Sequence, residues 1–111
     1  MTHCVVYTTI NDPDQAEHIA RTLLEARLVA CVNVLGPCIS LYSWQGELAR
    51  EAEYLLLMKT TVACEAAVIT RLQEIHPYEV PEVIVLPIAA GSPAYLRWLA
   101  AAVQPPHNQG G

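Results

Sequence analysis

Apolar residues along the first quarter of the chain predict a strand followed by a helix. A β-branched and aromatic run at 4–10 is typical of a buried strand. The next two residues, Asn11-Asp12, supply a polar capping side chain, and Pro13 is suited to the first helical turn. From Ala16 the apolar positions recur at i, i+3, i+4, i+7 and i+8, so we expect one helix up to position 27.

The middle of the chain predicts a long hairpin. The apolar run 28–35 indicates a buried strand, which Gly36-Pro37 stops or bends. Alternating residues at 38–44 lead to a tight turn at Gln45-Gly46, and the strand 47–59 returns. Strands this long exceed the average of about 5–6 residues and leave edges that must be paired. The hairpin therefore indicates self-association.

The last third predicts two helices and one strand. Thr60-Thr61 can cap a helix that Pro77 ends, because the residue before a proline is biased away from helix. An apolar strand follows at 83–86, and Ser92-Pro93 begins a short final helix. Residues 105–111 contain prolines, glycines and polar residues, so we expect a disordered tail.

The element order is β-α-β-β-α-β with an extra C-terminal helix. This order predicts an α+β, ferredoxin-like sandwich with a long hairpin between its second and third strands. A chain of 111 residues is long enough for one domain, assigned to 1–104, with the tail at 105–111. The fold class supports many functions and decides none of them.

Composition strengthens the expectation of self-association. Charged residues make up 15% of the chain, against about 25% in a typical soluble domain. Hydrophobic residues reach 53%, so we expect part of the surface to be covered by other copies of the chain or by a partner.

The charge balance excludes some partners. The net charge of −5, with a single lysine, disfavours nucleic acid and anionic membranes. No apolar run reaches the roughly 20 residues that span a bilayer. Four cysteines without a CxxC pair disfavour a zinc knuckle or a dithiol redox motif, and we interpret them as buried thiols. The N-terminus shows no basic region followed by an apolar stretch and a cleavage site, so we expect a cytoplasmic protein.

Two groups of side chains could carry chemistry. The segment 76–82, His-Pro-Tyr-Glu-Val-Pro-Glu, holds a histidine and carboxylates on a proline-stiffened backbone, which suits proton transfer or a borderline metal ion. The alternative is a helix-end histidine and a stiff connection. On the predicted strand 47–59, alternation places Glu51, Glu53 and Lys59 on one face, where Glu51 is interpreted as solvated. Glycine-rich phosphate loops and nucleophile–histidine spacings are missing, so no enzyme is expected.

Several blocks of the sequence resemble the CutA family of divalent-cation tolerance proteins. They are Leu-Val-Ala-Cys-Val-Asn at 28–33, Tyr-Ser-Trp-Gln-Gly-Glu at 42–47, Lys-Thr at 59–60, the string at 76–82, Leu-Pro-Ile at 86–88 and Tyr-Leu-Arg-Trp at 95–98. They cover about residues 4 to 103 in order. The resemblance implies a tight homotrimer, similar to the PII signalling proteins that bind small ligands in clefts between subunits. It also implies a cytoplasmic role in tolerance to divalent metals, copper above all, without enzymatic activity.

The resemblance also implies a set of cleft residues between subunits. They are Trp44, Glu53, Lys59, His76, Tyr78 and Glu82. His76 with Glu82 or Glu53 is the expected ligand set for Cu(II) or another divalent cation. Tyr42 and Trp44 are expected at the trimer interface.

At two positions this chain departs from some relatives. Thr8 and Ile75 stand where they carry a cysteine and a second histidine. The missing thiol weakens any site for Cu(I), which prefers sulfur ligands. No cofactor is required by this account. Two alternatives stay open: a sensor of a small anionic ligand countered by Lys59, and a structural or interaction trimer.

Overall fold

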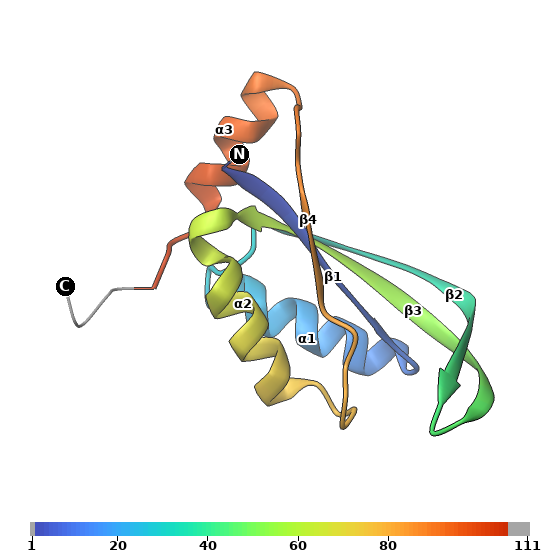
Figure 1. The fold of residues 1–111 in the computed structure, drawn as a ribbon. Helices are drawn as coiled ribbons and strands as arrows, with labels where there is room; N and C mark the ends of the chain where they lie inside the picture. The colour runs from blue at the N-terminus through green and yellow to red at the C-terminus, as the bar shows by residue number, and fades with distance from the viewer. Residues whose placement is uncertain (1, 107–111) are drawn as a thin grey trace.

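The computed structural model describes residues 2–106 and forms an α+β fold with one four-stranded antiparallel sheet and three helices (Figure 1). The strands are β1 (His3–Ile10), β2 (Cys31–Trp44), β3 (Glu47–Thr61) and β4 (Ile84–Pro87). The helices are α1 (Pro13–Glu25), α2 (Val62–Ile75) and α3 (Pro93–Ala102). The sheet order is β2-β3-β1-β4, so β2 and β4 are its edges. Every predicted element is present, in the predicted order.

Helix ends follow from the capping residues. Asp12, rather than Asn11, is the N-cap of α1, and its carboxylate accepts a 2.9 Å hydrogen bond from the Asp14 N–H. Ser92 caps α3 in the same way through Tyr95. Thr61 occupies the N-cap position of α2, but its side chain makes no capping hydrogen bond.

Alternation along β1 and β3 separates the two faces of the sheet. On β1 the even-numbered side chains are buried, and on β3 Leu56, Met58 and Thr60 are buried. These residues face α1 and α2, whose buried side chains include Leu23 and Leu72. Burial of each large apolar side chain stabilises the fold by about 1.5–3 kcal/mol. The odd-numbered residues of both strands point to the opposite face, which bears the site described below.

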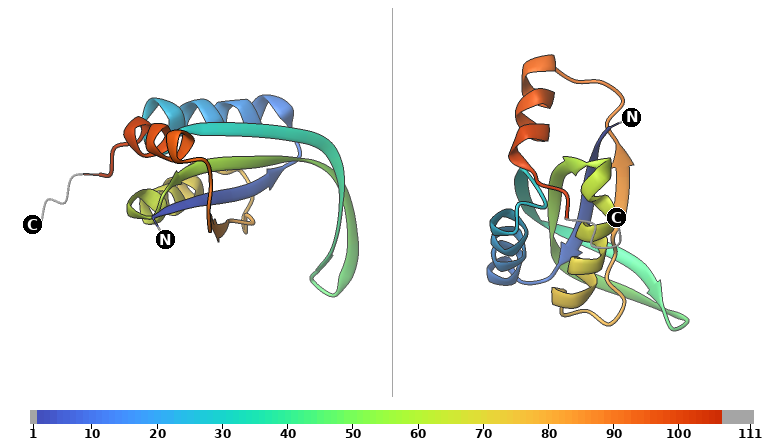
Figure 2. Two further views of the ribbon diagram at one scale, coloured as in Figure 1. Left: turned by 90° about the horizontal axis from the view of Figure 1, so that it is seen from above. Right: turned by 90° about the vertical axis from the view of Figure 1, so that its left-hand side faces the viewer.

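The hairpin of β2 and β3 extends well beyond the helices, and its outer half bends away from the rest of the molecule (Figure 2, left). The prediction of a buried strand at 28–35 is wrong for a single chain, because β2 is an edge strand. Val34 is 44% exposed and Leu35 is 47% exposed. The predicted tail at 105–111 lies mostly outside the described residues, which end at position 106.

Candidate functional site

A cavity of about 710 Å³ lies between the hairpin, the end of β1 and the segment that connects α2 to β4. The hairpin contributes polar and aromatic side chains, and the connecting segment contributes two carboxylates. The lining residues are Thr9, Ser40, Leu41, Tyr42, Trp44, Glu51, Glu53, Tyr78, Glu79, Val80, Pro81 and Glu82.

A β-bulge in β2 brings the hairpin side chains to this cavity. Leu35 is paired with Leu55 and Cys38 with Glu53, so β2 has one residue more than β3 across this step. The extra residue turns Ser40, Tyr42 and Trp44 toward the face that carries Glu51 and Glu53. The bulge depends on Gly36, whose φ of +146° is open to few other residues. A Cβ on Gly36 would lie 2.9 Å from Cδ2 of Tyr54 and 3.0 Å from the carbonyl oxygen of Glu53.

Two residues of the lining, Glu53 and Tyr78, are in direct contact. The Tyr78 hydroxyl donates a 2.7 Å hydrogen bond to Oε2 of Glu53 and lies 3.4 Å from Oε2 of Glu51. Glu53 is only 4% exposed. Burial raises the pKa of Tyr78, and the hydrogen bond and negative charge of Glu53 raise it further, so the hydroxyl keeps its proton.

Glu82 forms a second acidic position beside β1. Its Oε2 accepts a 3.2 Å hydrogen bond from the Tyr7 hydroxyl, and its Oε1 lies 3.4 Å from the Thr9 hydroxyl. The pKa of Tyr7 is raised by burial and then by the charge of Glu82. The pKa of Tyr42 is raised too, by burial and by the charges of Glu51 and Glu53. Tyr7, Tyr42 and Tyr78 thus each lie close to a carboxylate of the cavity.

His76 lies behind the cavity wall and supports it. The ring is 6% exposed, and Nε2 is 2.9 Å from the carbonyl oxygen of Thr9. The N–H of Tyr78 donates a 3.1 Å hydrogen bond to Nδ1. Because a carbonyl only accepts and an N–H only donates, these partners fix the neutral tautomer with its proton on Nε2. Burial lowers the pKa of His76, against smaller raising effects from Thr9 and Glu53.

The predicted cleft residues occupy three different positions in the structure. Trp44, Glu53, Tyr78 and Glu82 line one cavity, whereas His76 contacts it from behind. Lys59 is absent from the lining: it lies six residues from Glu53 along β3, about 20 Å for an extended strand, and donates a hydrogen bond to Oδ1 of Asn33. Alternation did place Glu51, Glu53 and Lys59 on one face, as predicted.

Sequence reasoning missed several cavity residues. Glu51 was interpreted as solvated, but it is half-buried in the lining and close to Tyr78. The contributions of Ser40 and Thr9 were also missed, since a lone hydroxyl on a strand carries no distinctive signal. Alternation along the strand places Ser40 on the same face as Tyr42 and Trp44, and this could have indicated Ser40.

The charges of this cavity all have the same sign. Four glutamates line it, and among residues 2–106 no lysine, arginine or histidine belongs to the lining. Ion pairs within residues 2–106 join Arg21 to Glu17 and Arg71 to Glu74, both on helix surfaces. The cavity carboxylates therefore have no cationic partner within the described part of the chain.

Residues 2–106 of one chain do not supply a complete metal site. Among residues 2–106, no three His, Cys, Asp or Glu side chains are grouped closely enough to hold a metal ion. Both nitrogens of His76 are already engaged, so coordination by this ring requires one of its hydrogen bonds to break. Carboxylate oxygens are the donors that remain, and they suit hard or borderline cations.

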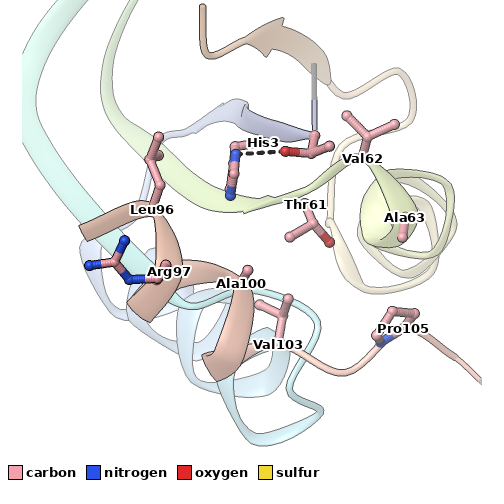
Figure 3. Close-up of a pocket in the computed structure, with 10 residues that line it drawn as sticks. His3, Thr61, Val62, Ala63, Leu96, Arg97, Ala100, Val103 and Pro105 are labelled. Atoms are coloured by element: carbon pink, nitrogen blue, oxygen red, sulfur yellow. Dashed lines mark hydrogen bonds between the residues drawn. The ribbon is translucent and has the colours of Figure 1, made fainter. Parts of the chain in front are cut away.

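A second cavity of about 640 Å³ lies between α3, the start of β1 and the start of α2 (Figure 3). Leu96, Ala100 and Val103 give it an apolar wall, and His3 and Arg97 are its basic side chains. None of the predicted site residues lies there. Within the described residues, no helix is long and apolar enough to cross a membrane.

Together, the fold and the first cavity define a small α+β protein with an acidic, aromatic pocket on a bent hairpin. Comparison with known proteins gives the family. The model of the CutA1 divalent ion tolerance protein family matches residues 4–102. The chain belongs to this family.

Individual relatives match along almost their whole length. The divalent-cation tolerance protein CutA of Thermus thermophilus is 45% identical over 86% of this chain and 92% of its own length. The protein of the same name from Pectobacterium atrosepticum is 40% identical over 90% of this chain and 91% of its own. The crystal structure of CutA1 from Oryza sativa covers 94% of this chain and 95% of its own, with 35% identity and a TM-score of 0.90.

Proposed function

We propose that the protein acts as a non-enzymatic homotrimer in tolerance of divalent metal ions, copper in first place. One observation carries the proposal: a cavity with four carboxylates and no basic side chain attracts cations. Glu53 and Glu82 are the proposed ligands from one chain, and His76 joins them when one of its two hydrogen bonds breaks. Because the described residues of one chain do not offer three grouped ligands, we propose that a neighbouring subunit completes the coordination of Cu(II).

Exposed apolar side chains support the assembly. Leu35 on β2, Leu86 on β4 and Trp98 on α3 are each between 47% and 50% exposed. Such a surface is unusual for a monomer that carries only 15% charged residues. The sheet order supports a ferredoxin-like protomer. The proposed trimer would be similar to that of PII proteins, with the cavity next to a subunit boundary and Tyr42 and Trp44 at the interface.

The anionic-ligand alternative has less support. Its proposed counter-charge, Lys59, is not part of the cavity lining and is hydrogen-bonded to Asn33. An anion in this cavity would face four glutamates. The interaction-trimer alternative needs no ligand and would be favoured if the purified protein bound neither metal nor small molecule.

We place the protein in the cytoplasm, which its four free cysteines support. One relative, from Archaeoglobus fulgidus, is described as a periplasmic divalent cation tolerance protein. Fractionation of the native cells, with cytoplasmic and envelope marker proteins, tests the location. Recovery in the envelope fraction would contradict it.

Calorimetric titration with Cu(II) tests the metal proposal. We expect Glu82→Gln and Glu53→Gln each to weaken binding, because each removes a charged oxygen donor. Glu25→Gln on α1 makes the same change in net charge outside the cavity and serves as the control. Equal heats for wild type and both cavity variants would overturn the proposal. Equal heats for wild type and His76→Ala would remove His76 as a ligand.

A further inference from the structure

The cavity combines features that a bare metal ion does not use. Three aromatic side chains, Tyr42, Trp44 and Tyr78, stand in its wall with the carboxylates. Aromatic rings supply no strong donor to a divalent metal, but their faces attract organic cations within about 6 Å of the ring centroid. A volume of about 710 Å³ is also within the usual range for small-molecule sites.

Glu53 needs a positive partner. The residue is only 4% exposed. A buried carboxylate is unfavourable unless it is paired and hydrogen-bonded. Tyr78 donates to Oε2 of Glu53, and within residues 2–106 no lysine, arginine or histidine forms an ion pair with this carboxylate. The nearby Glu51 adds a second negative charge. A donor with a positive charge would offset this excess negative charge.

We infer that this cavity binds an organic ammonium ion, with its N–H groups toward Glu53 and Glu51 and its carbon skeleton against Trp44 and Tyr42. The inference rests on the proposed role of the acidic cavity and names a further class of ligand for it. Divalent metals and ammonium ions would then compete for the same carboxylates. Burial raises the pKa of Tyr42 and Tyr78 most, and the neighbouring charges of Glu51 and Glu53 raise it further.

Three small probes of similar size separate charge from shape. Benzylammonium carries the proposed positive charge, benzyl alcohol is its neutral counterpart, and benzoate carries the opposite charge. We expect saturable binding of benzylammonium by calorimetry, and at least roughly tenfold weaker binding of the other two, since a hydrogen bond to a charged group contributes more than the free energy of a tenfold change. Equal or tighter binding of benzoate would overturn the inference.

Trp44 reports where the probe binds. The chain has two tryptophans, so in a Trp98→Phe background Trp44 is the single source of tryptophan fluorescence. Its fluorescence should change with benzylammonium at the same midpoint as the calorimetric signal. A calorimetric signal without a Trp44 response would place the probe elsewhere and contradict the inference.

Substitution of the carboxylate completes the test. Glu53→Gln keeps the shape and should weaken benzylammonium binding at least roughly tenfold, whereas Glu25→Gln should leave it unchanged. Retention of full affinity by a folded Glu53→Gln protein would overturn the assignment. The Cu(II) titration reports separately on the proposed function. Copper binding without ammonium binding rejects this inference alone, and the reverse result rejects the metal proposal alone.

Discussion

The hydroxyl of Tyr78 donates a 2.7 Å hydrogen bond to the buried carboxylate of Glu53. The two residues are 25 positions apart in the sequence, one on the hairpin and one after α2. Their contact joins the two elements that enclose the acidic cavity. It also connects the cavity with His76, whose ring accepts a hydrogen bond from the Tyr78 N–H and packs edge-on at 4.7 Å between ring centroids.

Tyr78→Phe should lower the free energy of unfolding by about 1–3 kcal/mol, because it leaves the Glu53 carboxylate buried without its donor. Denaturant unfolding with a fitted slope measures the change. Tyr54→Phe is the control, since the Tyr54 ring packs against the core and lies outside the cavity lining. Equal losses for the two variants would show that the Tyr78 hydroxyl has no special role.

Stability should fall in mild acid because of His76. Its pKa in the folded protein lies below the usual 6.5, so the unfolded chain binds the proton more readily. The stability that neutral His76 contributes is fully present above pH 6.5. Below this pH the free energy of unfolding falls by up to about 1.4 kcal/mol per pH unit.

Unfolding of wild type and His76→Gln between pH 8 and pH 5 isolates this effect. Glutamine does not titrate, so the variant should lose less stability in acid than the wild type. Parallel pH profiles would mean that His76 makes no contribution to the acid sensitivity.

Gly36→Ala should weaken both the fold and the cavity. A Cβ there meets Tyr54 and the backbone of Glu53, and a φ of +146° is strained for alanine. We expect a loss of about 1–3 kcal/mol or more in unfolding free energy. Gly46→Ala is the control: its φ is also positive, but no atom lies within 4 Å of the added Cβ. A larger loss at Gly46 than at Gly36 would contradict the importance of the bulge.

Leu35→Lys should break the proposed trimer. Leu35 is paired with Leu55, and both face away from the helices. A charge on this face would have to be buried between subunits. Leu24→Lys on α1 is the matched control, with 38% exposure against 47% for Leu35. Light scattering after size-exclusion chromatography should show smaller particles for Leu35→Lys only. An unchanged mass for Leu35→Lys would contradict an interface on this face.

Periodicity and capping residues predicted the elements because both are local signals. The Asp12–Pro13 pair marked the start of α1 and Ser92–Pro93 that of α3. The boundaries of the hairpin were predicted less well. Gly36-Pro37 was read as a stop or bend, whereas β2 continues through it with a bulge. A bulge is defined by how a strand pairs with its neighbour, and the sequence of one strand does not contain that pairing.

The site was predicted only in part, because some of its contacts join residues that are far apart in the sequence. Unusual charges on an inward-facing strand indicated Glu53, and the proline-flanked string indicated Tyr78 and Glu82. Lys59 shares a face with Glu53, but six residues of extended strand place it about 20 Å away, a distance that the prediction did not take into account. Glu51 was dismissed because its surroundings come from Tyr78, a residue 27 positions away.

Native mass spectrometry tests the central claim most directly, a trimer whose acidic cavities hold cations. Measured with and without Cu(II), wild type should give three chains of 12.2 kDa each, with copper mass increments that Glu53→Gln reduces and Glu25→Gln retains. A monomer, or increments that Glu53→Gln leaves unchanged, would contradict the account.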